Sequence, residues 1–303
     1  MGSLSIEARI ALQNAETPLM DRSLSDLSKL RHKTRQKIGP AVDAMVEQNI
    51  VRIDTKKIRG IPCLQVYPSR LKVDWQIFYG FGGGFVSGSP FEDLTIAIPI
   101  SVITGAVLII PEYRLAPESP WPAALDDGFL VYQQLSEKPF ALVGESAGGN
   151  LGLALMHLAI EASLRLPGAT AFISPWCDLT NSGDSIDAND GRDPALSRQH
   201  LSFSAKHYAG DNNLCDPRIS PINGVFDRTF PPCYISTGTR DLLMSQSVAL
   251  ADKLRRQGGP VYLRVWQDLW HVFEWDNNLP ESKISIREIS NFLKNHMTIQ
   301  RSA

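Results

Sequence analysis

The pattern of hydrophobic and polar positions divides the chain into two parts near residue 49. Residues 1 to about 48 carry apolar and charged side chains at helical spacing, most clearly in the runs 23–31 and 41–46. This spacing predicts two or three short amphipathic helices that need a surface to lie on. From residue 50 onward, short apolar runs typical of strands take over.

Strand-like and helix-like segments alternate along most of the remaining chain. The first two strand-like segments fit an antiparallel hairpin. Alternation of the later segments predicts an α/β fold with a mostly parallel central sheet and helices on both faces. The predicted strands are 51–53, 61–66, 76–79, 106–110, 141–143, 169–173, 233–236 and 261–265, and the predicted helices are 122–135, 151–160, 245–256 and 281–296.

The alternation breaks between Asp178 and Pro217. This stretch is polar and rich in aspartate at first, and then carries Leu201, Phe203 and Tyr208 at helical spacing. We expect an insertion that lies over the carboxyl ends of the strands, the edge where open α/β sheets bind ligands. The chain shows no internal repeat and no linker, which favours one domain with a cap over two independent domains.

Composition narrows the possible partners. The 303 residues include 43% hydrophobic side chains, enough for a large core, and the formal net charge of -2 argues against a nucleic-acid partner. Four widely separated cysteines predict reduced thiols in a cytoplasmic protein, with no metal site. No run approaches the roughly 18 apolar residues of a membrane span, and we expect no cofactor.

A predicted strand runs into a predicted helix through Gly144-Glu-Ser146-Ala147-Gly148. The pattern Gly-x-Ser-x-Gly in this context predicts a nucleophile elbow, a strained turn that raises the serine hydroxyl above the sheet. Tight packing of small residues between a strand and a helix is the alternative interpretation. The position of the motif, directly after 141–143, favours Ser146 as a nucleophile.

A serine nucleophile needs a base, and the base needs an acid that orients it. His271 follows a predicted strand and a short loop, at the sheet edge where Ser146 should emerge, whereas His157 falls on an apolar helix and the other four histidines fall in segments that look solvated. Asp241 follows the strand 233–236, although it could also cap the helix that begins near Ser245. The order Ser146, Asp241, His271 is typical of α/β-hydrolases.

A glycine-rich segment, residues 79–85, follows the third predicted strand. Consecutive glycines let backbone N–H groups converge on the oxyanion that ester hydrolysis creates. Phosphate binding is the rival interpretation, but Phe85 occupies the last glycine position of the Gly-x-Gly-x-x-Gly fingerprint, and no P-loop Lys-Ser/Thr follows.

With these motifs, the chain resembles the hormone-sensitive lipase family of α/β-hydrolases. The resemblance extends from about residue 50 and includes the blocks 113–118, 120–127, 174–179 and 216–221. It implies an α/β-hydrolase catalytic domain over residues 49–303, with a helical cap made of residues 1–48 and an insertion at about 180–215. It also implies that Ser146 is the nucleophile, His271 the base and Asp241 its orienter.

The same resemblance assigns the oxyanion hole to the N–H groups of Gly82, Gly83 and Ala147. The chain departs from the family at three positions: Phe81 replaces the histidine before the glycines, Glu145 replaces the usual aspartate before the nucleophile, and Leu269-Trp270 replaces Gly-Met before the base. We expect packing to replace the hydrogen bonds of the family histidine, and Trp270 to narrow the pocket or to pack structurally.

These observations predict a serine esterase that cleaves small or medium acyl esters or lactones through an acyl-enzyme. A specialised hydrolase or acyltransferase acting on a polyketide or terpenoid ester is one alternative, and a ligand receptor on the hydrolase fold is another. Exposed faces of the last strand and the C-terminal helix would allow a homodimer. The residues expected to line the substrate pocket are Phe81, Phe85, Trp176, Phe203, Tyr208 and Trp270.

Overall fold

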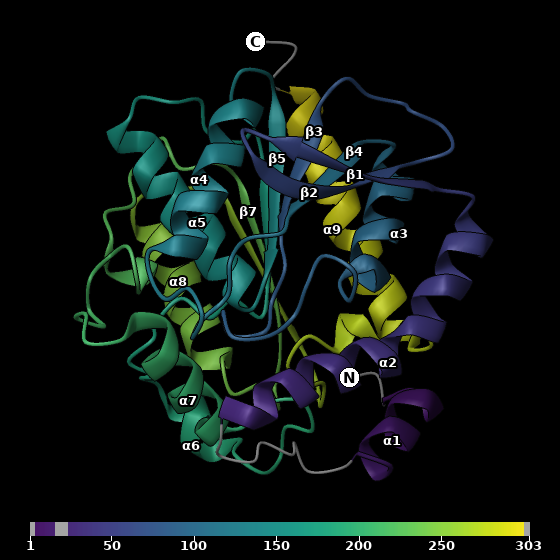
Figure 1. Cartoon of the computed structure of the whole chain (residues 1–303), viewed down its shortest axis with the longest axis vertical. Coiled ribbons are helices and arrows are strands. Elements are labelled where there is room, and N and C mark those ends of the chain that lie inside the picture. Colours follow the sequence, from purple (N-terminus) through teal and green to yellow (C-terminus); the bar gives the residue numbers. More distant parts are fainter. Residues whose placement is uncertain (1–3, 16–23, 300–303) are drawn as a thin grey trace.

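A mixed β-sheet runs through the centre of the molecule (Figure 1), which we describe from a computed structural model over residues 4–15 and 24–299. Within these residues the sheet has eight strands in the order β1-β2-β4-β3-β5-β6-β7-β8, and β2 is antiparallel to both neighbours while the rest run parallel. The strands are β1 (Arg52–Ile58), β2 (Ile61–Tyr67), β3 (Gln76–Gly80), β4 (Val107–Pro111), β5 (Phe140–Glu145), β6 (Thr170–Ile173), β7 (Cys233–Gly238) and β8 (Val261–Trp266).

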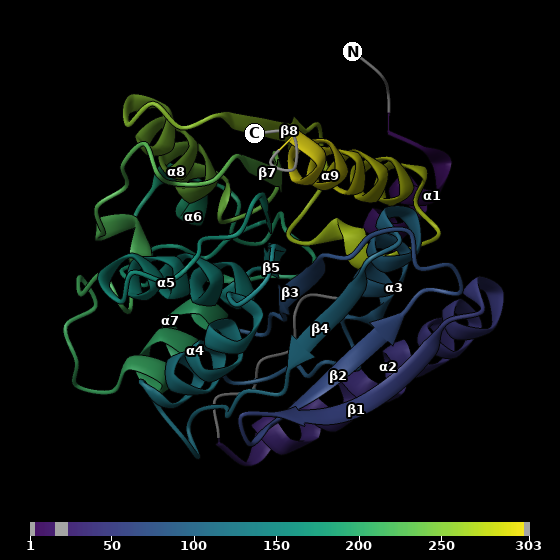
Figure 2. The same cartoon turned by 90° about the horizontal axis from the view of Figure 1, so that it is seen from above.

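Helices cover both faces of the sheet (Figure 2). On one face lie α4 (Ala123–Leu135), α5 (Ala147–Glu161) and α8 (Met244–Arg256), and on the other lie α3 (Leu94–Thr104) and α9 (Pro280–Ile299), with α2 (Leu24–Asn49) outside α3. This arrangement confirms the α/β fold that the alternation predicts. The sequence pattern gave no sign of α3, because eight of its residues are buried and the helix has no polar face.

The N-terminal part differs from the sequence prediction. Residues 24–49 form one helix of 26 residues that continues through Pro40, where we expected shorter helices. Its buried residues Leu27 and Val42 belong to the main hydrophobic core, so packing against the domain compensates for the backbone hydrogen bond that proline removes. The predicted segments at 1–3 and 16–23 lie outside the described residues.

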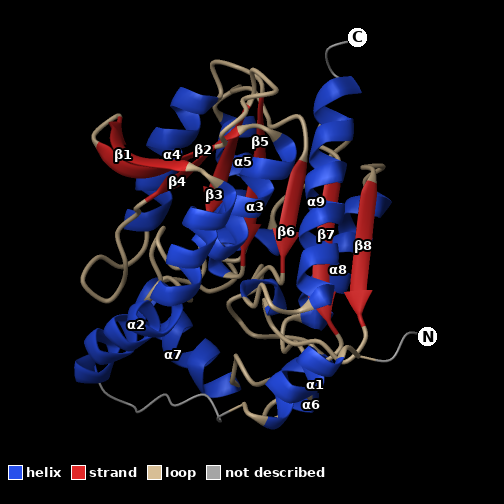
Figure 3. Ribbon diagram, turned by 90° about the vertical axis from the view of Figure 1, so that its right-hand side faces the viewer, coloured by secondary structure: helices blue, strands red, loops and turns tan. Residues whose placement is uncertain are grey.

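Four helices gather at the end of the molecule toward which the parallel strands point (Figure 3). They are the N-terminal α1 (Ile6–Gln13) and α2, together with α6 (Asp184–Ala188) and α7 (Arg198–Ala209) from the predicted insertion. Two short 3-10 turns, η1 (Pro221–Asn223) and η2 (Phe273–Trp275), complete the chain. α6 and α7 thus lie at the carboxyl ends of the parallel strands.

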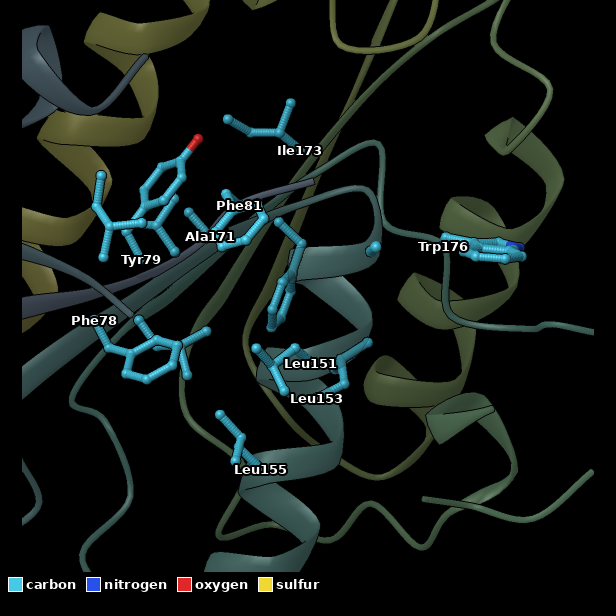
Figure 4. Packing of buried hydrophobic residues seen from close by; sticks show 14 of the residues in the cluster. Phe78, Tyr79, Phe81, Leu151, Leu153, Leu155, Ala171, Ile173 and Trp176 are labelled. Atoms are coloured by element: carbon cyan, nitrogen blue, oxygen red, sulfur yellow. The ribbon is translucent and has the colours of Figure 1, made fainter. Parts of the chain in front are cut away.

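The core fills the space between the sheet and its helices. Figure 4 shows Phe78 of β3 and the leucines of α5, among them Leu151 and Leu155, in one cluster, and all of these side chains are fully buried. This packing fixes β3 and α5 relative to each other, and with them the two loops that follow β3 and β5. No described helix combines the length and the apolar character that crossing a membrane requires.

Candidate active site

Ser146 sits on a sharp turn between β5 and α5. Its backbone has φ 51° and ψ -117°, a conformation that a non-glycine residue rarely adopts and that stores strain. The turn requires glycine at position 144, because a Cβ atom there would lie only 2.3 Å from the carbonyl oxygen of Gly148. Glycine at this position lets the helix cross close to the strand, so the serine side chain is presented at the sheet edge.

The loops after β5, β7 and β8 bring three polar side chains together. The Ser146 Oγ atom lies 3.0 Å from His271 Nε2, and His271 Nδ1 lies 3.0 Å from Asp241 Oδ1. These are the three residues that the sequence predicted as nucleophile, base and acid. With one imidazole nitrogen facing the hydroxyl and the other facing the carboxylate, the arrangement can accept the serine proton and stabilise the resulting positive charge.

Asp241 is fully buried and held by several donors. The Thr237 hydroxyl donates to Oδ2 at 2.9 Å, and the backbone N–H of Leu243 donates to Oδ1 at 2.8 Å. Burial alone would raise the pKa of this carboxyl, but the charge and the hydrogen bond of His271 outweigh burial, and the pKa is lowered. Asp241 therefore carries a negative charge beside the imidazole.

His271 shows the complementary shift. Burial lowers the pKa of the imidazole, yet the charge of Asp241 and its hydrogen bond outweigh burial, so the pKa is raised above its usual value. Ser146 and His271 are only 7% and 8% exposed. These two side chains are thus largely shielded from water, which strengthens the electrostatic interactions of the imidazole.

The glycine-rich loop after β3 is held by an aromatic side chain, that of Tyr113. The rings of Phe81 and Tyr113 are parallel with centroids 4.0 Å apart, and the Tyr113 hydroxyl donates to the Phe81 carbonyl oxygen at 2.6 Å. Past the glycines, the loop turns back through hydrogen bonds from the N–H groups of Val86 and Ser87 to the Gly83 carbonyl oxygen. The Phe81 ring, stacked on Tyr113, therefore occupies the position that the family histidine would take.

The loop also contacts the N-terminal helix α2. Arg31 Nε donates to the Val86 carbonyl oxygen at 2.8 Å, and its guanidinium forms an ion pair with Glu118 at 2.9 Å. The hydrogen bond from Arg31 lowers the pKa of Glu118. A helix far away in the sequence thus helps to hold the segment that follows the glycines.

Two buried carboxyl groups lie under the glycine loop. Glu145 directly precedes the nucleophile, and a Cβ atom on Gly82 would lie 1.7 Å from Glu145 Oε1. Burial raises the pKa of Glu145 well above its usual range and the pKa of Asp93 to about 7, while the backbone amide of Gly82 lowers both. The Gly82 amide therefore interacts with the carboxyls of Glu145 and Asp93.

The six aromatic residues predicted for the pocket fall into separate groups. Phe85 stacks on Tyr208 of α7 with ring centroids 3.9 Å apart, next to the glycine loop. Phe203, on the same helix, is partly buried. Trp176 is fully buried and its indole N–H donates to Asn181, whereas Trp270 packs in a second hydrophobic cluster with Ala8 of α1. Phe81 packs on Tyr113, as described above.

Two residues near the base escaped the sequence prediction. His200 was grouped with the solvated histidines, but it is partly buried on α7 close to His271, and burial lowers its pKa to about 4. A Cβ atom on Gly84 would lie 3.6 Å from His200 Nε2, which places this ring beside the glycine loop.

Asp193, between α6 and α7, accepts a hydrogen bond from the His271 backbone N–H at 3.0 Å. The aspartate-rich character of the insertion was the one signal that could have pointed to it.

The described residues hold no cluster of His, Cys, Asp or Glu suited to a metal ion, and all four cysteines are free thiols. The contact between the Ser146 hydroxyl and His271 Nε2 is of the kind that can support nucleophilic attack by the serine.

Comparison with known proteins also points to ester hydrolysis. Residues 77–275 match the family model described as alpha/beta hydrolase fold. An acetyl-hydrolase of Streptomyces hygroscopicus is 32% identical over 225 residues, which cover 72% of this chain and 75% of the relative. A crystallised esterase superposes with a TM-score of 0.87 at 29% identity, covering 97% of this chain and 94% of the other. A second crystal structure, an esterase of the bacterial hormone-sensitive lipase family, gives a TM-score of 0.79 at 27% identity, covering 92% and 100%.

Proposed function

Because the chain belongs to the hormone-sensitive lipase family of α/β-hydrolases and is a serine ester hydrolase, we propose that Ser146, His271 and Asp241 are its catalytic triad. The observation that carries this proposal is the unbroken chain of two 3.0 Å contacts from the Ser146 hydroxyl through the imidazole to the carboxylate.

In the proposed reaction, His271 Nε2 takes the proton of the Ser146 hydroxyl while Oγ attacks the ester carbonyl carbon. The tetrahedral intermediate collapses, and His271 gives the proton to the leaving alcohol, which leaves an acyl-serine. His271 then deprotonates a water that attacks the acyl carbon. As the second tetrahedral intermediate collapses, His271 returns this proton to Ser146 Oγ, and the carboxylic acid is released. Asp241 holds the imidazole by accepting from Nδ1–H and stabilises its positive charge.

We propose that the backbone N–H groups of Gly83 and Ala147 bind the oxyanion. Gly83 precedes the turn formed with Val86 and Ser87, and Ala147 is the first residue of α5 after the nucleophile. Gly82, the third donor that the resemblance implies, has its amide beside the carboxyls of Glu145 and Asp93, so we assign it to holding the loop. One such donor is worth about a hundred- to a thousandfold in rate.

We propose that α1, α2, α6 and α7 form the cap over this site, with residues 49–303 as the hydrolase domain. Arg31 attaches α2 to the glycine loop, and Phe85 stacks on Tyr208 of α7. This stacked pair fills space next to the loop, which favours small or medium acyl groups. The name acetyl-hydrolase of the relative described above favours the same size range. Within the predicted pocket lining, we assign Phe85, Phe203 and Tyr208 to this wall.

Replacement of Ser146 tests the proposal. The variant Ser146→Ala should lower the hydrolysis of p-nitrophenyl butyrate by about 10⁴-fold or more and abolish labelling by a fluorophosphonate. The matched control Ser69→Ala, at an exposed serine, should keep both. Activity that survives in Ser146→Ala would refute the assignment of the nucleophile.

A series of nitrophenyl esters from acetate to decanoate, run beside simple lactones, tests the substrate class. We expect kcat/KM to be highest for short chains and to fall steeply as the chain lengthens. A rate that rises toward decanoate would contradict the proposed pocket.

We also propose a homodimer and a cytoplasmic location. Among the described strands β8 pairs with β7 alone, and its Tyr262 and Val265 are 49% and 37% exposed, so this edge can pair with a second copy. Sedimentation should give a dimer that Val265→Asp converts to a monomer.

The free thiols support the proposed location in a reducing compartment, which cell fractionation can test.

A further inference from the structure

Asp193 is a buried carboxyl group in the insertion, between α6 and α7. It is 2% exposed, and each of its oxygens accepts hydrogen bonds from backbone N–H groups. Oδ1 accepts from Ala195 at 2.8 Å and from Leu196 at 3.2 Å, whereas Oδ2 accepts from His271 at 3.0 Å. The first two bonds close a turn within the insertion. The third crosses to the loop after β8 and ends on the backbone of the base.

The segment that carries Asp193 is also attached to the loop of Asp241. The Asn189 side-chain amide donates to the carbonyl oxygens of Thr239 and Asp241, at 3.1 and 2.9 Å, and the Ser185 hydroxyl donates to that of Leu242. The insertion therefore touches both loops that carry the base and its orienting acid. Among the residues that hold the insertion are Asp241 and His271, whose positions matter for the proposed proton transfer.

We propose that Asp193 is a positioning residue for His271: it fixes the backbone of the base and places a second carboxylate beside it. This role deepens the proposed function, because it rests on His271 acting as the base.

The charged groups around His271 support this role. Asp241 faces the ring from the loop after β7, Asp193 from the insertion and Glu274 from η2, and each raises the pKa of the imidazole; His200 faces it from α7. Burial and the neighbouring Asp241 raise the pKa of Asp193 itself to about 7, while His271 and the backbone donors lower it. Loss of the Asp193 carboxylate therefore removes negative charge from the surroundings of the base.

Two variants remove the charge and differ in the contacts that remain. Asp193→Asn keeps one acceptor oxygen and replaces the other with an NH2 donor, whereas Asp193→Ala removes both acceptors. In both, the acid limb of the pH profile of kcat/KM should move to lower pH. In Asp193→Ala, kcat should also fall about 10- to 100-fold, because the base is no longer held in place.

NMR titration of the His271 ring gives a readout that does not depend on turnover. The imidazole pKa should fall in Asp193→Asn even when ester hydrolysis is blocked by Ser146→Ala. Asp187→Asn is the matched control. Asp187 is an exposed carboxylate in the same insertion and pairs with Arg198, so its loss removes a charge but should leave the titration of His271 unchanged.

The outcomes distinguish this proposal from the proposed triad. Asp193 variants with reduced thermal stability but an unmoved acid limb and an unmoved ring titration would show a structural role only and overturn the inference. Should Asp193→Ala not fold, the same two measurements on Asp193→Asn decide. Activity surviving in Ser146→Ala would overturn the triad, whereas the titration of His271 would still report on Asp193.

Discussion

The phenyl ring of Phe81 is stacked on the ring of Tyr113 with an angle of 6° between the ring planes, and the Tyr113 hydroxyl donates to the Phe81 carbonyl oxygen. Both residues are buried, at 1% and 2% exposure. One tyrosine thus holds the glycine loop through its ring and through its hydroxyl. This explains how the loop keeps its shape where the family uses a histidine.

Tyr113→Phe should separate these two contributions. The stacking surface stays, but the buried Phe81 carbonyl oxygen loses its donor, which costs about 1–3 kcal/mol. We expect a lower urea midpoint and a reduced kcat, measured on p-nitrophenyl butyrate. Tyr132→Phe is the matched control, because its hydroxyl also donates to a backbone carbonyl, that of Arg165, away from the loop. Equal losses of kcat in the two variants would contradict a specific role for Tyr113.

Gly82→Ala should disturb the loop through a clash. A Cβ atom at this position would lie 1.7 Å from Glu145 Oε1, so the loop or the carboxyl must move. We expect kcat to fall at least about tenfold, with a smaller effect on KM, since Gly83, the proposed oxyanion donor, is displaced with its neighbour. Gly39→Ala, in α2 with open space around the added atom, should retain full activity. Gly82→Ala with normal kcat would show that the loop tolerates the movement.

Glu145→Gln should change how stability depends on pH. The pKa of Glu145 is raised in the folded protein, so the folded state binds its proton more tightly than the unfolded state does. The stability linked to this proton is present below the unfolded pKa and is lost as pH rises toward the folded value. Asp93, with a pKa of about 7, adds a loss over about pH 4 to 7.

In urea denaturation, Glu145→Gln should therefore lose less stability between pH 5 and pH 8 than the unsubstituted protein. The exposed Glu137→Gln serves as control and should follow the unsubstituted protein. Identical pH slopes for Glu145→Gln and the unsubstituted protein would mean that Glu145 keeps an ordinary pKa.

The acid limb of the activity profile should reflect His271. Only the neutral imidazole can take the serine proton, and the pKa of His271 is raised above its usual value of 6.5. We expect kcat/KM to fall as the pH drops through a midpoint above that value. Asp241→Asn should lower kcat by about 10⁴-fold, because the imidazole loses its orienting acceptor. A limb centred below pH 6 would contradict the ion pair between the two residues.

The sequence by itself determined the features that depend on local order. Alternating strands and helices predicted the α/β fold, and the turn residues around Ser146 predicted the elbow, because both depend on spacing over a few residues. The candidates Asp241 and His271 followed from their places after late strands, since parallel strands end at one edge of the sheet. The structure brings both to 3.0 Å contacts with their partners.

Tertiary structure alone decided the contacts between segments that lie far apart along the chain. Asp193 and His271 are 78 residues apart, and Arg31 and Val86 are 55 apart, so no local pattern relates them. The long helix α2 and the largely buried α3 likewise depend on packing against the domain, which overrides the signals of Pro40 and Pro99. The partial burial of His200, which we expected to be solvated, has the same cause. Burial depends on segments that come together in the folded molecule and does not follow from the neighbouring residues in the sequence.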